Sequence, residues 1–176
     1  MLISGTEIPV PDLRYMAWSG VQQWARAVCS QTQRIAAVPR MDVAALHIEQ
    51  HFFVVAAAHF LSYKDWALEF GCYDSVDFRP LDVFDRRHIT DLRNMREHMI
   101  EYFKEEGRAQ QRWFRETPEF QADASSCIGT LIGGRLDWRE FGGVVGGLLP
   151  AIMAEPMPGV AEYVAAANAG NAPPEA

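Results

Sequence analysis

The chain has 176 residues, 49% of them apolar and 22% charged, and its 23 acidic and 16 basic side chains give a net charge of −7. This composition excludes an intrinsically disordered chain, and the negative charge excludes a protein that coats nucleic acid through bulk positive charge. The length suits one hydrophobic core and is short for two, so we predict a single helical domain over residues 1–164.

Helical periodicity predicts two long helices in the first half of the chain. Apolar residues recur at helical spacing over residues 12–38 and then stop at a proline. Asp42 can cap a second helix that continues to Phe70 and stops at Gly71. This helix is apolar on most sides, so we expect it at the centre of the fold. Turn residues over 72–81 predict a loop.

The pattern after this loop predicts a third long helix over residues 85–114, with Asp85 at its start and a bend at Gly107. The dipeptide Thr117–Pro118 then ends this helix. The apolar stripe of this helix includes Tyr102 and Phe103.

The chain beyond residue 118 changes character. Residues 127–136 mix β-branched residues with glycine and predict a small β-hairpin. Asp137 can cap a fourth helix to Leu149, and the small, proline-bearing residues 165–176 predict a flexible tail. The expected fold class is therefore mainly α: an up-and-down helical bundle of three to four long helices with a small β-hairpin near 127–136.

The cysteines and the N-terminus indicate a cytoplasmic protein. Cys29, Cys72 and Cys127 are odd in number and widely spaced, as expected for reduced thiols. No apolar run near the start resembles a signal sequence. The longest uncharged apolar block, Phe141 to Ala154, is shorter than the roughly 20 residues that cross a bilayer, so we expect no membrane partner.

One motif in the third predicted helix contains candidate catalytic residues. Arg93 is followed directly by Asn94, and His98 stands five positions after the arginine. This spacing resembles the R-x4-6-H motif of the HEPN superfamily (higher eukaryotes and prokaryotes nucleotide-binding domains), in which a polar residue such as Asn follows the arginine. The resemblance covers residues 41–114.

The resemblance implies a metal-independent endoribonuclease without a cofactor, in which a 2′-hydroxyl of RNA attacks the adjacent phosphate. His98 would serve as general base or acid, because its ordinary pKa near 6.5 suits proton transfer at neutral pH. Arg93 would stabilise the charged phosphate by a forked contact, and Asn94 would hold the imidazole or a phosphate oxygen. On one helix, Arg93 and His98 point about 140° apart, so the shared cleft requires a homodimer.

Residues 79–115 are the one net-positive part of the chain, with nine basic and seven acidic side chains. Basic and aromatic residues alternate near its end, a pattern that can contact a phosphate backbone and a base. The candidate RNA-binding residues are Arg96, Arg108, Arg112, Arg115 and Trp113. An alternative interpretation is that the cations complement a helix C-terminus while the aromatic residues pack inward.

Two other functional classes remain open. His47 and His51 are four residues apart, and a three-histidine metal site in a helical bundle would be possible if His59, two turns further, or His98 supplied the third ligand. A non-catalytic helical module that binds nucleotides, RNA or another protein is the principal alternative to the ribonuclease. The ribonuclease hypothesis implies RNA and a second copy of the chain as partners, and a toxin or defence role would add a neutralising partner protein.

Overall fold

The computed structural model describes residues 2–3, 6–7, 10–39, 41–116 and 120–159, and these form a mainly helical fold. The α-helices are α1 (Val10–Ala37), α2 (Val43–Glu69), α3 (Arg86–Glu97), α4 (Met99–Phe103) and α5 (Trp138–Ala154). The 3-10 helices are η1 (Arg79–Leu81) and η2 (Gln110–Arg112). The strands are β1 (Leu2–Ile3), β2 (Thr6–Glu7), β3 (Phe114–Glu116), β4 (Gln121–Asp123), β5 (Cys127–Ile128), β6 (Leu131–Ile132) and β7 (Leu136–Asp137). The predicted fold class is confirmed.

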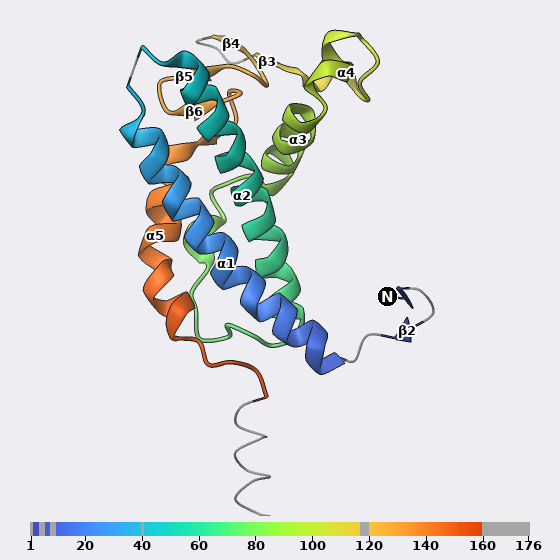
Figure 1. The fold of residues 1–176 in the computed structure, drawn as a ribbon, viewed down its shortest axis with the longest axis vertical. Coiled ribbons are helices and arrows are strands. Elements are labelled where there is room, and N and C mark those ends of the chain that lie inside the picture. The colour runs from blue at the N-terminus through green and yellow to red at the C-terminus, as the bar shows by residue number, and fades with distance from the viewer. Residues whose placement is uncertain (1, 4–5, 8–9, 40, 117–119, 160–176) are drawn as a thin grey trace, which may run out of the picture.

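Three long helices form the bundle. α1 and α2 run antiparallel, and α5 returns along α1 (Figure 1). Phe141 of α5 makes edge-on ring contacts with Phe53 and Phe60 of α2, with ring centroids 6.1 and 6.5 Å apart, and all three rings are fully buried. Since α2 also packs against α3, it is the central helix, as predicted.

Side-chain caps begin three of the helices where the sequence indicates. Asp42 accepts a hydrogen bond from the backbone N–H of Ala45 at 3.0 Å. Asp85 and Asp137 each accept two backbone N–H groups from the first turns of α3 and α5. These bonds satisfy donors that a helix start leaves unpaired. Gly71 adopts the left-handed conformation (φ 65°) just beyond α2, which ends that helix.

The predicted third helix over residues 85–114 is wrong in its second half. α3 ends at Glu97, and His98 leaves the regular helical conformation (φ −109°, ψ 27°) before the short α4. After α4, two successive backbone N–H groups donate to the carbonyl oxygen of Glu101, at 2.8 and 3.0 Å. These bonds turn the chain back on itself, so residues 104–109 form a loop instead of further helical turns.

Gly107 does not bend a helix, because it lies in this loop and accommodates an aromatic ring. A Cβ atom at Gly107 would lie 2.8 Å from Cγ of Tyr102, closer than real contacts allow. The Tyr102 ring also stacks on Trp113, with centroids 5.2 Å apart, and Trp113 is buried. The aromatic spacing that indicated a helix therefore reflects packing between α4 and the segment that follows it.

The β3–β4 and β5–β7 sheets lie at one end of the bundle, and the β1–β2 pair lies apart from them near the N-terminal end of α1, as Figure 1 shows. The predicted hairpin near 127–136 is confirmed as β5 and β6, and β7 adds a third antiparallel strand. The β3–β4 and β1–β2 pairs were not expected from the sequence. Gly133 (φ 56°) lies so close to Leu92 of α3 that a Cβ atom would overlap that side chain, so the strands pack directly on α3.

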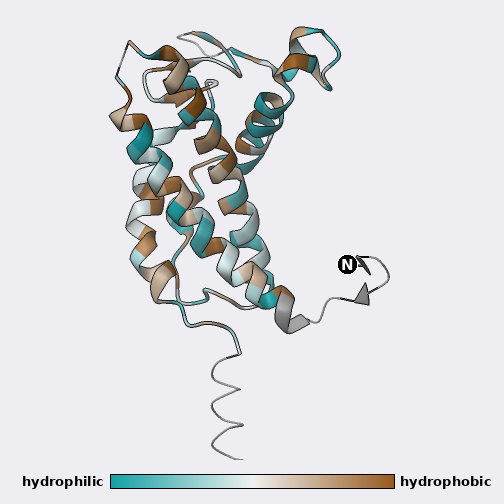
Figure 2. Ribbon diagram, in the orientation of Figure 1, coloured by the Kyte–Doolittle hydropathy of each residue, from teal (hydrophilic) through white to brown (hydrophobic). Residues whose placement is uncertain are grey.

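Helix α2 has the length and mean hydropathy of a membrane-spanning helix, and it is the one such helix in the described part of the chain. Figure 2 shows hydrophobic residues at several places along this helix. In the fold the helix packs between α1 and α3, and its fully buried residues are Phe53, Val54, Ala57, Phe60 and Ala67. This is the position of a core helix. The tail predicted over residues 165–176 lies outside the described residues.

Two glycines of α5 provide a matched test of helix packing. A Cβ atom at Gly142 would overlap the side chain of Thr32 on α1, whereas one at Gly143 would meet nothing within 4 Å. We expect Gly142→Ala to lower the free energy of unfolding by about 1–3 kcal/mol, because α1 and α5 must separate. Gly143→Ala should raise it by about 0.5–1 kcal/mol through helix propensity. Urea unfolding followed by circular dichroism would measure both, and equal effects would contradict this account of the α1–α5 contact.

Candidate functional site

A pocket of about 610 Å³ opens beside the C-terminal end of α3. Four of its lining residues are among the candidates from the sequence, namely Asn94, His98, Arg108 and Arg112. The other residues that line it are Asp91, Met95, Glu101, Tyr102 and Ala109. The fold therefore brings half of the eight sequence candidates together within a single chain.

The break at the end of α3 positions His98. The ring is exposed, and its Nδ1 atom lies 3.0 Å from Oε1 of Glu101 in α4. When Nδ1–H donates to this carboxylate, Nε2 is the basic nitrogen of the ring. The change of direction between α3 and α4 thus provides His98 with a carboxylate partner that fixes its orientation.

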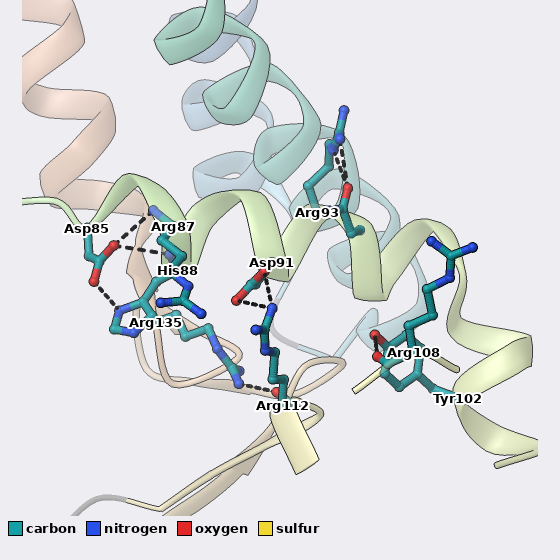
Figure 3. Close-up of polar contacts among 10 residues, drawn as sticks. Asp85, Arg87, His88, Asp91, Arg93, Tyr102, Arg108, Arg112 and Arg135 are labelled. Atoms are coloured by element: carbon teal, nitrogen blue, oxygen red, sulfur yellow. Dashed lines mark hydrogen bonds and ion pairs between the residues drawn. The ribbon is translucent and has the colours of Figure 1, made fainter. Parts of the chain in front are cut away.

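Arg93 lies on the opposite side of α3, facing α2, as Figure 3 shows. Its Nε and Nη2 atoms donate to Oδ1 of Asn94 at 3.1 and 2.7 Å, and Nε lies 3.5 Å from the carboxylate of Glu97. Because Arg93 occupies the amide oxygen, the amide NH₂ is the group that Asn94 can offer to the pocket. Within one chain Arg93 orients Asn94 and does not line the pocket with His98.

The loop after α4 brings Arg108 to the pocket. The Tyr102 hydroxyl donates to the backbone carbonyl of Arg108 at 2.6 Å. The neighbouring Ala109 holds a left-handed conformation (φ 54°), which is unfavourable for a residue with a Cβ atom. This loop is therefore held in one conformation by the Tyr102 bond and by the turn onto Glu101.

Arg112 approaches the pocket from η2. Its Nη1 atom lies 3.2 and 3.4 Å from the two carboxylate oxygens of Asp91 on α3. Its backbone carbonyl accepts a hydrogen bond from Arg135, whose guanidinium also donates to the carbonyl of Gly133 at 2.6 Å. Arg112 thus connects the β5–β7 sheet to the polar face of α3.

Two of the residues predicted to contact RNA are buried, which corrects that assignment. Arg96 is 5% exposed and donates from Nη2 to the carbonyl of Ser125 at 3.3 Å. Trp113 is also 5% exposed, because it packs on Tyr102. Neither side chain offers a surface to a strand of RNA. The inward-packing alternative for the aromatic residue is therefore the correct one.

The spacing of the three remaining candidate arginines in the sequence is that of one helix face. In the structure they do not lie on one helix. Arg108 lies in the loop, Arg112 in η2 and Arg115 in β3. Arg115 has its Nη1 atom 3.2 Å from Nδ1 of His88, which lies in the first turn of α3. These cations reach the same side of α3 by three different local structures.

The histidines of α2 do not converge into a metal site. His59 stacks on Trp24 of α1, with ring centroids 4.4 Å apart. Burial lowers the pKa of His51 and His59, and the charges of Arg96 and Arg93 respectively lower it further. In the described ranges, no three metal-ligating side chains come together. The three-histidine interpretation therefore lacks its third ligand.

Three residues that line the pocket were not predicted from the sequence: Asp91, Glu101 and Tyr102. Asp91 is seven residues before His98, two helical turns along the same face, and this spacing is visible in the sequence. Glu101 and Tyr102 reach the pocket only because the helix breaks at His98. No sequence pattern indicated that break.

Comparison of the chain with protein-family models, curated proteins and solved structures finds no match.

The histidines of α2 predict a loss of stability in acid. Their pKa values in the folded protein lie below the ordinary value of 6.5, so the unfolded chain binds these protons more readily. Stability is fully present above the unfolded pKa and falls as the pH drops through the lowered folded values. We expect a lower urea midpoint at about pH 5.5 than at about pH 7.5. The difference should shrink in the His51→Gln/His59→Gln variant, and an unchanged difference would contradict the assignment.

Proposed function

We propose that the protein is a metal-independent endoribonuclease that uses the pocket at the end of α3. The observation that carries this proposal is the convergence of His98, Asn94, Arg108 and Arg112 on one pocket. A base, a neutral donor and two guanidinium groups are the side chains that transesterification of RNA requires. The resemblance of the Arg93–His98 spacing to the HEPN motif supports the same chemistry.

His98 transfers the proton in the proposed reaction. Its Nε2 atom takes the proton of the RNA 2′-hydroxyl while Glu101 holds Nδ1. The 2′-oxygen attacks the adjacent phosphorus, and the bond to the 5′-oxygen breaks. The imidazolium formed in the first step returns the proton to the leaving 5′-oxygen. The products are a 2′,3′-cyclic phosphate and a free 5′-hydroxyl.

The neighbouring polar groups stabilise the charged phosphate. The amide NH₂ of Asn94 donates to a phosphate oxygen, since Arg93 occupies the amide oxygen. Arg108 and Arg112 supply the positive charge. Asp91 orients Arg112 and neutralises part of its charge, so Arg108 is the main electrostatic contact.

A homodimer accounts for the position of Arg93. In one chain this guanidinium lies across α3 from the pocket. A bidentate contact between Arg93 and the phosphate therefore requires a second copy of the chain, whose Arg93 points toward the first chain's His98. Ile100 and Phe103 of α4 are 70% and 66% exposed beside the pocket. These apolar side chains favour a protein contact at this place, either with a second copy or with a neutralising partner.

Cleavage in the presence of EDTA tests the catalytic proposal. We expect the wild-type protein to cut a labelled single-stranded RNA and to leave a cyclic phosphate, while an all-deoxy strand stays intact. His98→Ala should slow cleavage by about 100-fold or more. His47→Ala is the matched control, because His47 is exposed on α2 away from the pocket, and it should retain full activity.

Absence of cleavage by the wild type, or equal activity of the His98→Ala variant, would refute the ribonuclease. RNA binding or protein binding without cleavage would then support the non-catalytic helical module.

Mixing two inactive variants tests the dimer. If Arg93 acts on the partner's pocket, a mixed dimer of one Arg93→Ala chain and one His98→Ala chain has one pocket with both a histidine and the partner's arginine. Activity then returns to a fraction of the wild-type rate. If Arg93 acts only by orienting Asn94 in its own chain, the mixture stays inactive. Sedimentation velocity of the wild type supplies the independent measurement, and a monomer at all concentrations would contradict the dimer.

A further inference from the structure

We propose that a row of arginines along α3, consisting of Arg87, Arg115, Arg135 and Arg112, binds the phosphate backbone of the RNA that extends from the cleaved bond. We call these four residues the arginine row. This inference rests on the function proposed for the pocket, and it adds the path that the substrate takes outside the pocket.

One face of α3 connects the row to the pocket. Arg87, Asp91, Asn94 and His98 are spaced by four, three and four residues, so they lie on one side of the helix. Figure 3 shows Arg87 and Arg112 on this side, with Arg93 on the other. The eleven residues from Arg87 to His98 rise about 16 Å along the helix axis. Because stacked nucleotides rise about 3.4 Å each, this length accommodates more than one phosphate.

Strand β3 and the turn between β6 and β7 place two further arginines beside this face. Arg115 of β3 contacts the ring nitrogen of His88, and Arg135 donates to the backbone carbonyls of Gly133 and Arg112. Neither contact neutralises the guanidinium charge, because imidazole and carbonyl acceptors are uncharged. Burial lowers the pKa of Arg135, and the nearby charge of Arg115 lowers it further, whereas the carboxylate of Asp91 acts in the opposite direction.

The positive charge of the pocket and row is local to their guanidinium groups. Five arginines line the pocket and row, namely Arg87, Arg108, Arg112, Arg115 and Arg135. The carboxylates of Asp85, Asp91 and Glu101 contact neighbouring side chains, and the exposed Glu105, Glu106 and Glu116 lie in the same loop and strand as Arg108 and Arg115. In a chain of net charge −7, a polyanion would therefore be attracted to these guanidinium groups and repelled by the many carboxylates elsewhere.

The first turn of α3 departs from the usual charge preference of helices. It contains Arg86, Arg87 and His88 and no acidic residue, although the helix dipole disfavours cations there. Arg86 has a structural partner, since it pairs with Asp65 of α2. Arg87 is exposed, and among the described residues its side chain forms no ion pair, although the carboxylate of Asp85 is close enough to interact with its charge. A locally unfavourable cation at the surface is expected where an anion binds.

RNA suits the row better than an acidic protein does. Guanidinium groups recognise phosphate by two parallel hydrogen bonds, and their arrangement in a line matches a polymer with regularly spaced charges. The row also ends at the pocket where a ribose hydroxyl would react. These features favour a single strand of RNA that lies along α3 with its reactive phosphate at His98.

Binding measurements in a His98→Ala background test the row without cleavage. We expect Arg87→Gln/Arg115→Gln to weaken the binding of a fluorescein-labelled single-stranded RNA of about 12 nucleotides by about tenfold. The slope of log affinity against log salt should fall by about 1.4, since each lost single-strand phosphate contact contributes about 0.7. Arg26→Gln/Arg34→Gln removes the same charge from exposed sites on α1 and should leave both quantities unchanged.

Two further measurements separate this inference from the proposed function. With His98 intact, Arg87→Gln/Arg115→Gln should slow cleavage of the 12-nucleotide RNA much more than cleavage of a dinucleotide, because a dinucleotide occupies only the pocket. If the wild type cleaves nothing yet the row variant loses RNA affinity, the ribonuclease fails and the row stands. Equal loss of affinity in the α1 control, unchanged affinity in the row variant, or equally tight binding of polyglutamate would overturn the row.

Discussion

The turn that closes onto the carbonyl of Glu101 determines the rest of the candidate site. Two backbone N–H groups converge on this oxygen directly after α4, and they reverse the chain before another helical turn can form. The reversal places Arg108 beside His98 and lets η2 and β3 run back along α3. A continuous helix over the same residues would have carried these arginines away from the imidazole. Local backbone hydrogen bonding thus creates the pocket.

The bundle could be predicted from the sequence because its signals are local. Asp42 and Asp137 mark helix starts by capping, and the apolar periodicity of the second helix identifies it as the core element. The third helix was overextended for the same reason. Tyr102 and Phe103 continue its apolar stripe, whereas the actual contact of Tyr102, a stack on Trp113 across a loop, is a tertiary interaction that no periodicity records.

The candidate site could be predicted in part. His98 and Asn94 were identified by a motif, and both line the pocket. Arg96 was misassigned because a sequence does not show which arginine of a basic segment points inward to Ser125. Glu101 and Arg135 were absent from the prediction, since Glu101 reaches the site through a helix break and Arg135 through the turn between β6 and β7. The residue types alone indicated which side chains could take part in catalysis. Which of them lie together in the pocket became clear only from the fold.

The environment of Tyr102 has a consequence for base selectivity. Its ring packs against Gly107 and stacks on Trp113, so the aromatic side chain that lines the pocket already serves in the packing of the protein. A nucleobase entering the pocket would gain little by stacking there, and the arginines address the phosphates, which are the same in every nucleotide. Under the proposed function, strands of unrelated base sequence should be cut at similar rates, and accessibility of the RNA would decide where the cut falls.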